Sequence, residues 1–305
     1  MKKIRLGRSG FESSRLAYGC MRIAGDGSGE ARDRGKRALR AAIDAGYTLF
    51  DHADIYASGE CEALFGELLA ESPGLRDQLV VLTKSGIRFA GDPDPTSPGR
   101  YDFSKDYLRT CVEGSLKRLN VEQIDVLLLH RPDYLADFHA VVELFDELAD
   151  SGKVAHFGVS NFSPSQVSLL QSLTSRPLIV NQVEINLHNT SAFSDGTLDQ
   201  CIERRMTPQA WCPIAVLAYP AWGNTFSADD EARIRAEVDR QAGIYGVDDW
   251  LVALAWLLRH PAGISPIVGS TTPGRIVAAV RALDIDYSRE DWYRLLEARN
   301  AAPVP

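Results

Sequence analysis

Four residues of types that can move protons follow apolar runs at separate places in the chain. Asp51 ends the run TLFD, Lys84 ends LVVLTK and His130 ends IDVLLLH, while Tyr56 closes the segment DHADIY. If these runs are neighbouring parallel strands, about 4.8 Å apart, their carboxyl ends converge at one edge. The spacing therefore predicts one site with a carboxylate, a phenol, an ammonium and an imidazole. Taken singly, an aspartate or histidine at a strand end is more often a helix cap or a partner for loop amides.

These groups suit acid–base chemistry at a carbonyl oxygen. A tyrosine has an ordinary pKa of about 10, and a nearby Lys84 ammonium is expected to lower that pKa by stabilising the phenolate. Asp51 would keep the lysine charged, so that Tyr56 serves as a general acid. His130 would orient the carbonyl. The set offers no obvious nucleophile and no electron source, so a reduction needs a bound hydride donor.

Eight strand-like runs would position these residues. They are RLAYG (15–19), the three runs above, and the runs at 155–160, 178–182, 208–213 and 264–269. Helical patterns with a period of about 3.6 lie between them, for example at 31–45, 104–119, 138–151 and 164–173. Strands that alternate with helices favour a parallel sheet, and eight such units over roughly 250 residues predict an α/β fold, the (β/α)8 TIM barrel. We expect one domain over residues 1–305, with an N-terminal hairpin and an extra C-terminal helix.

Helix N-cap motifs support this assignment of strands and helices. The segment SNFSPSQ predicts a capping box between Ser163 and Gln166, with Pro164 at the first helical position. The segment SRED predicts the same arrangement between Ser288 and Asp291 for the last helix.

Two strand-to-helix connections are unusually long: residues 85–103 and the segment that begins PIAVLAYPAWGNTFS at residue 213. Long loops at this end of a barrel usually carry substrate specificity. The start IRLGRSGFESS is typical of a short hairpin and is placed to close the barrel bottom.

Composition narrows the function classes. The 305 residues are 45% hydrophobic and 24% charged, with a net charge of −8, and no dense basic run favours nucleic acid. The N-terminus lacks the apolar segment of a secretory signal, and the run WLVALAWLL is too short to span a bilayer. Five cysteines without a CxxC pair fit a reduced, cytoplasmic protein.

Five segments in order resemble the aldo-keto reductase family over nearly the whole chain. They are DHADIY, LTKSG, SLKRLNVEQIDVLLLHRPD, GVSNF (158–162) and NQVE (181–184). The version DHADIY…CEALFGELL resembles the bacterial oxidoreductase branch. The resemblance implies NADPH-dependent reduction of an aldehyde or ketone, with Asp51, Tyr56, Lys84 and His130 as the catalytic residues.

The same resemblance assigns cofactor contacts. Ser160, Asn161 and Gln182 would hold the nicotinamide carboxamide, and Trp211 would stack on the ring where many relatives have tyrosine. The remaining cofactor-binding residues implied are Gly19, Cys20, Met21, Asp51, Cys212, Pro213, Ile214, Gly269 and Thr271. No metal-ligating residue is implied.

The segment PIVGSTTPGRI predicts the binding site for the cofactor's phosphate. Free amides and the dipole of a helix that begins near Pro273 favour an anion. The hydroxyls of Ser270 and Thr272 and the guanidinium of Arg275 would add charge-assisted contacts, and a 2′-phosphate partner for Arg275 favours NADP(H) over NAD. This location agrees with the phosphate sites of other barrels near the last strands.

Some positions depart from the family pattern. Gly269 replaces a common lysine, and Ala278 and Ala279 replace common Glu and Asn residues. Arg131 follows His130 where tryptophan is common. At the mouth, Arg131, with Arg22 and Arg88 as other candidates, would either favour anionic substrates or be solvent-facing or paired with a loop acid.

Two other function classes stay open from the sequence. A metal-dependent hydrolase or lyase could use Asp51, His52, Asp54 and His130, although the strand pattern points His52 away from Asp51. A nucleotide-sensing barrel subunit with weak activity is the other alternative. The expected partner is a small-molecule carbonyl compound, with no nucleic acid or membrane, and a monomer is favoured. The carbonyl substrate itself depends on the long loops.

Overall fold

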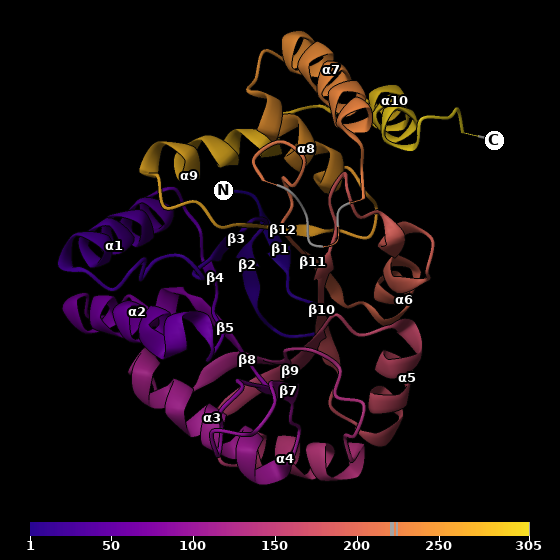
Figure 1. Ribbon diagram of the computed structural model, residues 1–305. Helices are drawn as coiled ribbons and strands as arrows, with labels where there is room; N and C mark the ends of the chain where they lie inside the picture. Colours follow the sequence, from indigo (N-terminus) through magenta and orange to yellow (C-terminus); the bar gives the residue numbers. More distant parts are fainter. Residues whose placement is uncertain (220–222, 224, 305) are drawn as a thin grey trace.

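Eight parallel strands close into a barrel in the computed structural model, which describes residues 1–219, 223 and 225–304 (Figure 1). Strand β12 pairs with β3, with Ile267 opposite Ala17, and this pairing closes the sheet. The predicted (β/α)8 barrel is therefore confirmed. Around the barrel the strands are β3 (Ala17–Gly19), β4 (Leu49–Asp51), β5 (Val80–Ser85), β8 (Ile124–Leu129), β9 (Val154–Ser160), β10 (Leu178–Glu184), β11 (Thr207–Trp211) and β12 (Ser265–Val268).

Helices surround this barrel on its outer side (Figure 1). The surrounding helices are α1 (Gly29–Asp44), α2 (Glu60–Glu71), α3 (Lys105–Leu119), α4 (Phe138–Asp150), α5 (Pro164–Leu173), α6 (Thr197–Arg204), α8 (Asp249–Leu258) and α9 (Pro273–Ala279). Two further helices, α7 (Ala228–Tyr245) and the expected C-terminal α10 (Arg289–Asn300), pack against each other beyond α8. The sequence pattern did not identify α7, because its buried side is narrow and includes a glutamine: Ile234, Val238 and Gln241.

Short elements complete the fold. The N-terminal hairpin of β1 (Lys3–Arg5) and β2 (Glu12–Ser14) is confirmed, and its turn delivers the fully buried Leu6 into the barrel interior. The first long loop contains a second hairpin, β6 (Ile87–Arg88) and β7 (Arg100–Tyr101). Part of the second long loop, at 220–222 and 224, lies outside the described residues.

The cap predictions differ in outcome. The capping box of Ser163 and Gln166 is present at α5. At α10, the Ser288 hydroxyl accepts a hydrogen bond from the Asp291 amide, but the reciprocal bond is absent among the described residues. The Ser288 amide instead donates to the Tyr245 hydroxyl, because the Asp291 carboxylate is shared among other donors that include Arg240.

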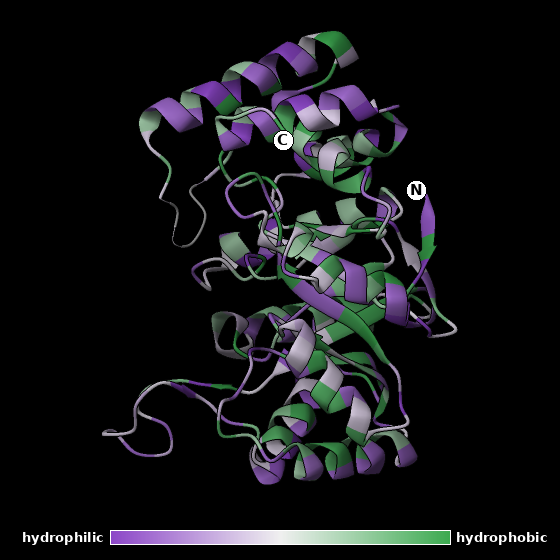
Figure 2. Ribbon diagram, turned by 90° about the vertical axis from the view of Figure 1, so that its right-hand side faces the viewer, coloured by the Kyte–Doolittle hydropathy of each residue, from purple (hydrophilic) through white to green (hydrophobic). Residues whose placement is uncertain are grey.

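Apolar side chains separate into an interior and an outer layer. Figure 2 shows apolar strands in the centre and helices with hydrophilic outer faces. Leu49, Leu82 and Leu128 belong to the cluster that fills the barrel interior. Across the described chain, no helix has both the length and the apolar character required to cross a membrane.

Side-chain alternation along the strands decides which residues reach the barrel mouth. Residues two apart on a strand point to the same face, so the residues two positions after interior-facing ones lie in the next layer. Asp51 follows Leu49 in this way, and Lys84 follows Leu82. We call this set the mouth layer: Gly19, Asp51, Lys84, His130, Ser160, Gln182, Trp211 and Gly269. One residue from each strand or its end therefore faces a common space.

Candidate functional site

Lys84 is the centre of the site. Its side chain is fully buried, and its ammonium lies 2.8 Å from Asp51 Oδ1. The ammonium also donates to the Tyr56 hydroxyl at 3.1 Å and to the backbone carbonyl of His52 at 2.8 Å. An ammonium has three protons, so all three are used and the lysine is fixed in position. The four predicted residues are thus brought together, with the ring of His130 6.1 Å from that of Tyr56.

Burial and neighbouring charges have opposite effects on the pKa values of Lys84 and Tyr56. Burial alone would lower the pKa of Lys84, but the Asp51 carboxylate and Tyr56 outweigh it and raise that pKa. Lys84 therefore stays protonated. Burial raises the pKa of Tyr56 above its ordinary value, and the Lys84 ammonium opposes this rise without cancelling it. The expected net lowering of the tyrosine pKa is wrong, because desolvation of the phenolate exceeds the stabilisation by the lysine.

His130 is a neutral imidazole in this environment. Burial lowers its pKa well below the ordinary value, and the charges of Lys84 and Arg131 lower it further. Its Nδ1 atom is buried and has no hydrogen-bond partner among the described residues. A neutral imidazole with an uncommitted nitrogen can donate one hydrogen bond to a carbonyl oxygen beside Tyr56.

Three predicted cofactor residues form a connected group on β9 and β10. The Ser160 hydroxyl donates to the backbone carbonyl of Gln182 at 2.9 Å, and the Asn161 amide nitrogen donates to Ser160 Oγ at 2.8 Å. Asn161 has a φ of 60°, a left-handed conformation that asparagine tolerates better than most residues. Its Oδ1 accepts from Trp211 Nε1 at 3.0 Å. The amide is therefore held rigidly on both sides.

Gln209 was missed by the sequence analysis. The Gln182 side chain donates to Asp51 Oδ1 at 2.7 Å and to Gln209 Oε1 at 2.9 Å, so both of its amide hydrogens are committed. Its own Oε1 is what remains to accept a bond from a ligand. Gln209 is fully buried on β11, two residues before Trp211. In the sequence, its position as a polar residue inside the run PQAWCP could have indicated a role in the site.

A partly buried ion pair lies behind the strand that carries Lys84. Glu62 on α2 is fully buried and accepts from Thr83 Oγ1 at 2.6 Å and from Arg118 Nε at 2.8 Å. Thr83 points outward next to the inward-facing Lys84. Because Glu62 joins α2, α3 and β5, the network fixes the strand that carries the lysine.

Asp54 lies beside this network. Burial raises its pKa to about 7, and Glu62 adds to the rise, while Cys111 and Arg118 oppose it. Its backbone amide donates to the carbonyl of Lys84 at 3.1 Å. Asp54 is therefore coupled to the loop that carries Tyr56.

Two mouth-layer positions carry no side chain: Gly19 ends β3, and Gly269 directly follows the neighbouring strand β12. A Cβ at Gly19 would meet Ile267 Cγ2 at 2.8 Å, whereas one at Gly269 would meet nothing within 4 Å. The space beside Gly19 is therefore filled by Ile267, whereas Gly269, at the start of the predicted phosphate segment, leaves room for a side chain or a ligand. There the Thr272 amide donates to Ser270 Oγ, and Arg275 is exposed, with no ion pair to any described residue.

The other predicted cofactor residues occupy different environments. Cys20 is fully buried with the outer layer, and burial raises the pKa of its thiol. Met21 is 52% exposed. Cys212, Pro213 and Ile214 follow Trp211 in the loop after β11, where Cys212 has a φ of 51°, and Thr271 lies between Ser270 and Thr272.

The residues of the metal hypothesis do not gather. His52 points outward, as predicted, with its ring 4.7 Å from that of Phe65, and burial lowers its pKa to about 3. Within residues 1–219, 223 and 225–304, no group of three or more His, Cys, Asp or Glu side chains is placed to hold a metal ion.

The three arginines near the mouth have different roles. Arg88 is committed to its own hairpin, since it pairs with Asp92 and Asp102 at 2.8 Å each. The guanidinium of Arg131 lies 5.5 Å from the centre of the Trp211 ring, and that of Arg22 lies 5.5 Å from the Tyr219 ring. Neither forms an ion pair with a described residue. Of these three arginines, only Arg88 is paired with acidic residues of a loop.

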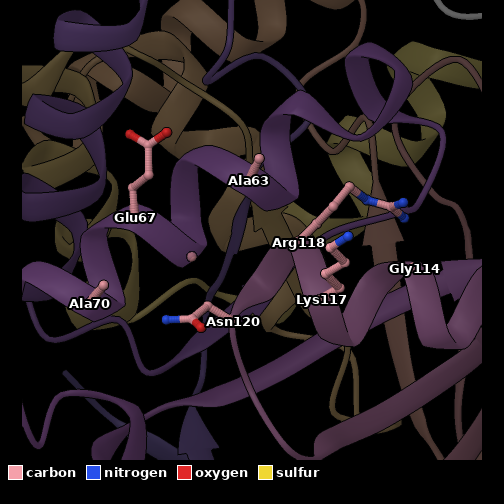
Figure 3. A pocket seen from close by; sticks show the side chains of 8 residues that line it. Ala63, Glu67, Ala70, Gly114, Lys117, Arg118 and Asn120 are labelled. Carbon is pink, nitrogen blue, oxygen red and sulfur yellow. The ribbon is translucent and has the colours of Figure 1, made fainter.

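One cavity lies away from this site. It has a volume of about 630 Å³ on the outside of the barrel, where Ala63, Gly66 and Glu67 of α2 face residues of α3, Lys117 among them (Figure 3). Glu67 pairs with Arg32 and Lys36, so its charge is already neutralised. Another cavity, of about 350 Å³, is lined in part by Arg131, Asn161 and Trp211.

The closed barrel and its mouth layer define a (β/α)8-barrel protein with a candidate acid–base site at the carboxyl ends of its strands. The chain belongs to the aldo/keto reductase family, whose model matches residues 15–300. It is 41% identical over 269 residues to the uncharacterized oxidoreductase YcsN of Bacillus subtilis, covering 86% of this chain and 87% of that protein. It is 38% identical over 310 residues to 6-dehydroglucose reductase of Novosphingobium aromaticivorans, with 99% and 96% coverage. An aldo/keto reductase from Klebsiella pneumoniae, solved with NADP and acetate, has a TM-score of 0.79 and 26% identity over 100% of this chain and 96% of its own.

Proposed function

We propose that the protein is an NADP-dependent carbonyl reductase that converts an aldehyde or ketone into an alcohol. The contact that carries this proposal is the buried Lys84 ammonium, which bridges Asp51 at 2.8 Å and the Tyr56 hydroxyl at 3.1 Å. A phenol next to a fixed ammonium and a neutral imidazole is an arrangement for protonating a carbonyl oxygen.

The mouth layer fits a nicotinamide cofactor. Ser160, Asn161 and Gln182 offer hydroxyl and amide groups, and Trp211 offers an aromatic face. Gln182 can only accept a bond from the carboxamide, because its amide hydrogens are committed to Asp51 and Gln209. The family membership and the NADP complex of the Klebsiella enzyme support NADP(H) as the cofactor.

NADPH, when bound, supplies the hydride for the carbonyl carbon. The chain's own residues supply the proton and the geometry. His130 donates a hydrogen bond to the carbonyl oxygen and orients it, and Tyr56 then transfers its phenolic proton to that oxygen. Lys84 stabilises the phenolate that forms, and Asp51 holds Lys84 charged throughout. Because burial raises the pKa of Tyr56, the proton stays on the phenol until the oxygen gains charge.

The loop before α9 supports a preference for the phosphorylated cofactor. Arg275 is exposed and has no ion pair to a described residue, so its guanidinium is free for a 2′-phosphate. Ser270 and Thr272 would add hydroxyl contacts. Gly269, in place of the lysine common in the family, provides no charge here, so most of the NADP preference rests on Arg275.

The substrate class follows from the same site and from the relatives. A similar protein is named for 6-dehydroglucose, an aldehyde of a sugar, which makes sugar aldehydes the first candidates. We further propose that residues 1–305 form a single barrel domain that acts as a cytoplasmic monomer.

The test measures NADPH oxidation with a panel of aldehydes, ketones and diketones that includes 6-dehydroglucose. A fluorescence titration of NADPH runs beside it. We expect saturable binding together with turnover of at least one panel member. Tight binding without any turnover would contradict the reductase and favour a nucleotide-sensing barrel.

A further inference from the structure

A buried glutamine beneath the mouth layer has no role of its own in the proposed chemistry. Gln209 lies on β11, directly opposite Gln182 in the pairing of β10 with β11, and it is fully buried. The barrel interior beneath the site is filled by apolar side chains that include Leu49, Leu82 and Leu128. A glutamine at such a position needs a reason, because its amide must leave water to reach it.

The Gln209 side chain makes a single hydrogen bond within the described part of the chain. Its Oε1 accepts from Gln182 Nε2 at 2.9 Å, whereas its own Nε2 is buried and has no partner among the described residues. A buried amide nitrogen without an acceptor destabilises the folded state. A methionine is a flexible apolar residue that fills such a space without this cost. What Gln209 supplies, and an apolar residue would not, is therefore one acceptor atom directed at Gln182.

This acceptor fixes the plane of the Gln182 amide. Gln182 Nε2 donates both of its hydrogens, one to Asp51 Oδ1 at 2.7 Å and one to Gln209 Oε1. Because the amide group is planar, two bonds in different directions set its orientation, including the direction of Oε1. With the bond to Asp51 alone, the amide would turn about its last side-chain torsion, which is broad in glutamine. Gln182 Oε1 accepts no hydrogen bond from a described residue and is not fully buried, so it is the atom that a ligand at the mouth can reach.

We propose that Gln209 is a positioning residue for the cofactor: it holds the Gln182 amide in the plane in which Oε1 accepts a hydrogen bond from the NH2 group of the nicotinamide carboxamide. This inference rests on the proposed NADP-dependent reductase. Because Gln209 is fully buried, it acts through Gln182 and not by contact with the cofactor. The consequence is selective. Loss of the Gln209 acceptor weakens recognition of the carboxamide NH2 group and leaves the contacts to the rest of the cofactor unchanged.

The test uses two cofactors that differ at the carboxamide alone. NADP+ carries the NH2 group, and its 3-acetylpyridine analogue carries a methyl group in the same place. The dissociation constants of both are measured by quenching of tryptophan fluorescence for the wild type, Gln209→Met and Gln209→Leu, and denaturant unfolding reports the stability of each protein. The matched control is Gln200→Met. Gln200 is also a buried glutamine, but its amide donates to the Pro164 carbonyl at 2.7 Å and to Ser168 Oγ at 2.9 Å, between the outer helices α5 and α6.

We expect the wild type to bind NADP+ about three- to tenfold more tightly than the analogue, since one hydrogen bond separates them. In both Gln209 variants this ratio should fall to less than about twofold, through weaker binding of NADP+ and unchanged binding of the analogue. Both variants should fold with a stability close to that of the wild type, and Gln200→Met should leave the ratio unchanged.

Three results would overturn the positioning role: a wild type that binds both cofactors equally, a ratio that is unchanged in a folded Gln209 variant, or the failure of both Gln209 variants to fold, which would make Gln209 a structural residue. Failure of the wild type to bind NADP+ at all would instead contradict the proposed reductase.

Discussion

The exchange of Lys84 for methionine tests the buried contact on which the site depends. Methionine keeps the unbranched shape but leaves the buried Asp51 carboxylate with Gln182 as its polar partner. Removing one member of a buried ion pair typically costs about 3–5 kcal/mol, because a charge stays buried without compensation. Lys84 is fully buried and the side chain of Asp51 is only 4% exposed, so we expect Lys84→Met to lower the free energy of unfolding by an amount in this range.

The assay is denaturant unfolding followed by circular dichroism, with the free energy of unfolding obtained by linear extrapolation. The double variant Lys84→Met with Asp51→Asn should recover most of the loss, because no unpaired charge remains. Lys153→Met is the matched control: it removes an exposed pair with Glu113, with side chains 40% and 47% exposed. We expect it to cost less than about 1 kcal/mol. If Lys84→Met costs no more than Lys153→Met, or if the double variant recovers nothing, the reasoning about the buried pair is wrong.

Three further predictions concern the cofactor and pH. Arg275→Ala should weaken NADPH by about tenfold or more while NADH changes little, measured by fluorescence titration; an equal loss for both cofactors contradicts the 2′-phosphate role. Gly269→Lys should tighten NADPH binding in the same titration, because its Cβ would meet nothing within 4 Å; weaker binding would mean that this space is occupied by the cofactor itself. Asp54→Asn should be more stable than wild type by an amount that grows as the pH rises from about 4 to about 7. The pKa of Asp54 is raised from 3.8 to about 7 in the folded state, so the folded protein holds this proton more tightly than the unfolded chain. The free energy of unfolding of the wild type therefore falls as the pH rises from about 4 to about 7, and Asn, which does not titrate, avoids this loss. A stability difference between Asp54→Asn and wild type that does not change from pH about 4 to about 8 would refute this assignment.

The catalytic residues could be predicted because strand geometry has a simple period. Asp51, Lys84 and His130 each lie two residues beyond an interior leucine, so a correct assignment of three strands was sufficient to place them side by side. The outward orientation of His52 followed from the same alternation. Tyr56 was within reach because a loop of a few residues returns to the strand end.

Properties that depend on packing could not be read from the chain. The net pKa of Tyr56 depends on how completely its surroundings exclude water, and the position of Lys84 in the sequence says nothing of that. Gln209 looked like an isolated polar residue in an apolar run and Glu62 like one of several acidic residues on a helix, since their partners Gln182 and Arg118 lie far away in the sequence. Helix α7 escaped detection because its apolar stripe contains few apolar residues and is completed by contacts with α10.

The partners of Arg88 and Arg131 also depend on the tertiary structure and not on the local sequence. Arg88 and Arg131 look equivalent in the sequence, as basic residues shortly after a barrel strand. Only the folded loop brings Asp92 and Asp102 to Arg88, while Arg131 is left facing Trp211. Which of these arginines has its charge neutralised by an acidic partner therefore depends on the tertiary structure and cannot be read from the sequence.

The central claim is that the phenol of Tyr56 delivers the proton while the cofactor is held by other residues. The most direct measurement determines the NADPH dissociation constant and the rate of carbonyl reduction side by side for wild type and Tyr56→Phe. We predict a dissociation constant within about threefold of wild type and a rate lower by about a hundredfold to ten-thousandfold, as expected for the loss of a general acid. A variant that still reduces its substrate at the wild-type rate, or one that loses cofactor binding and activity to the same degree, would contradict the account.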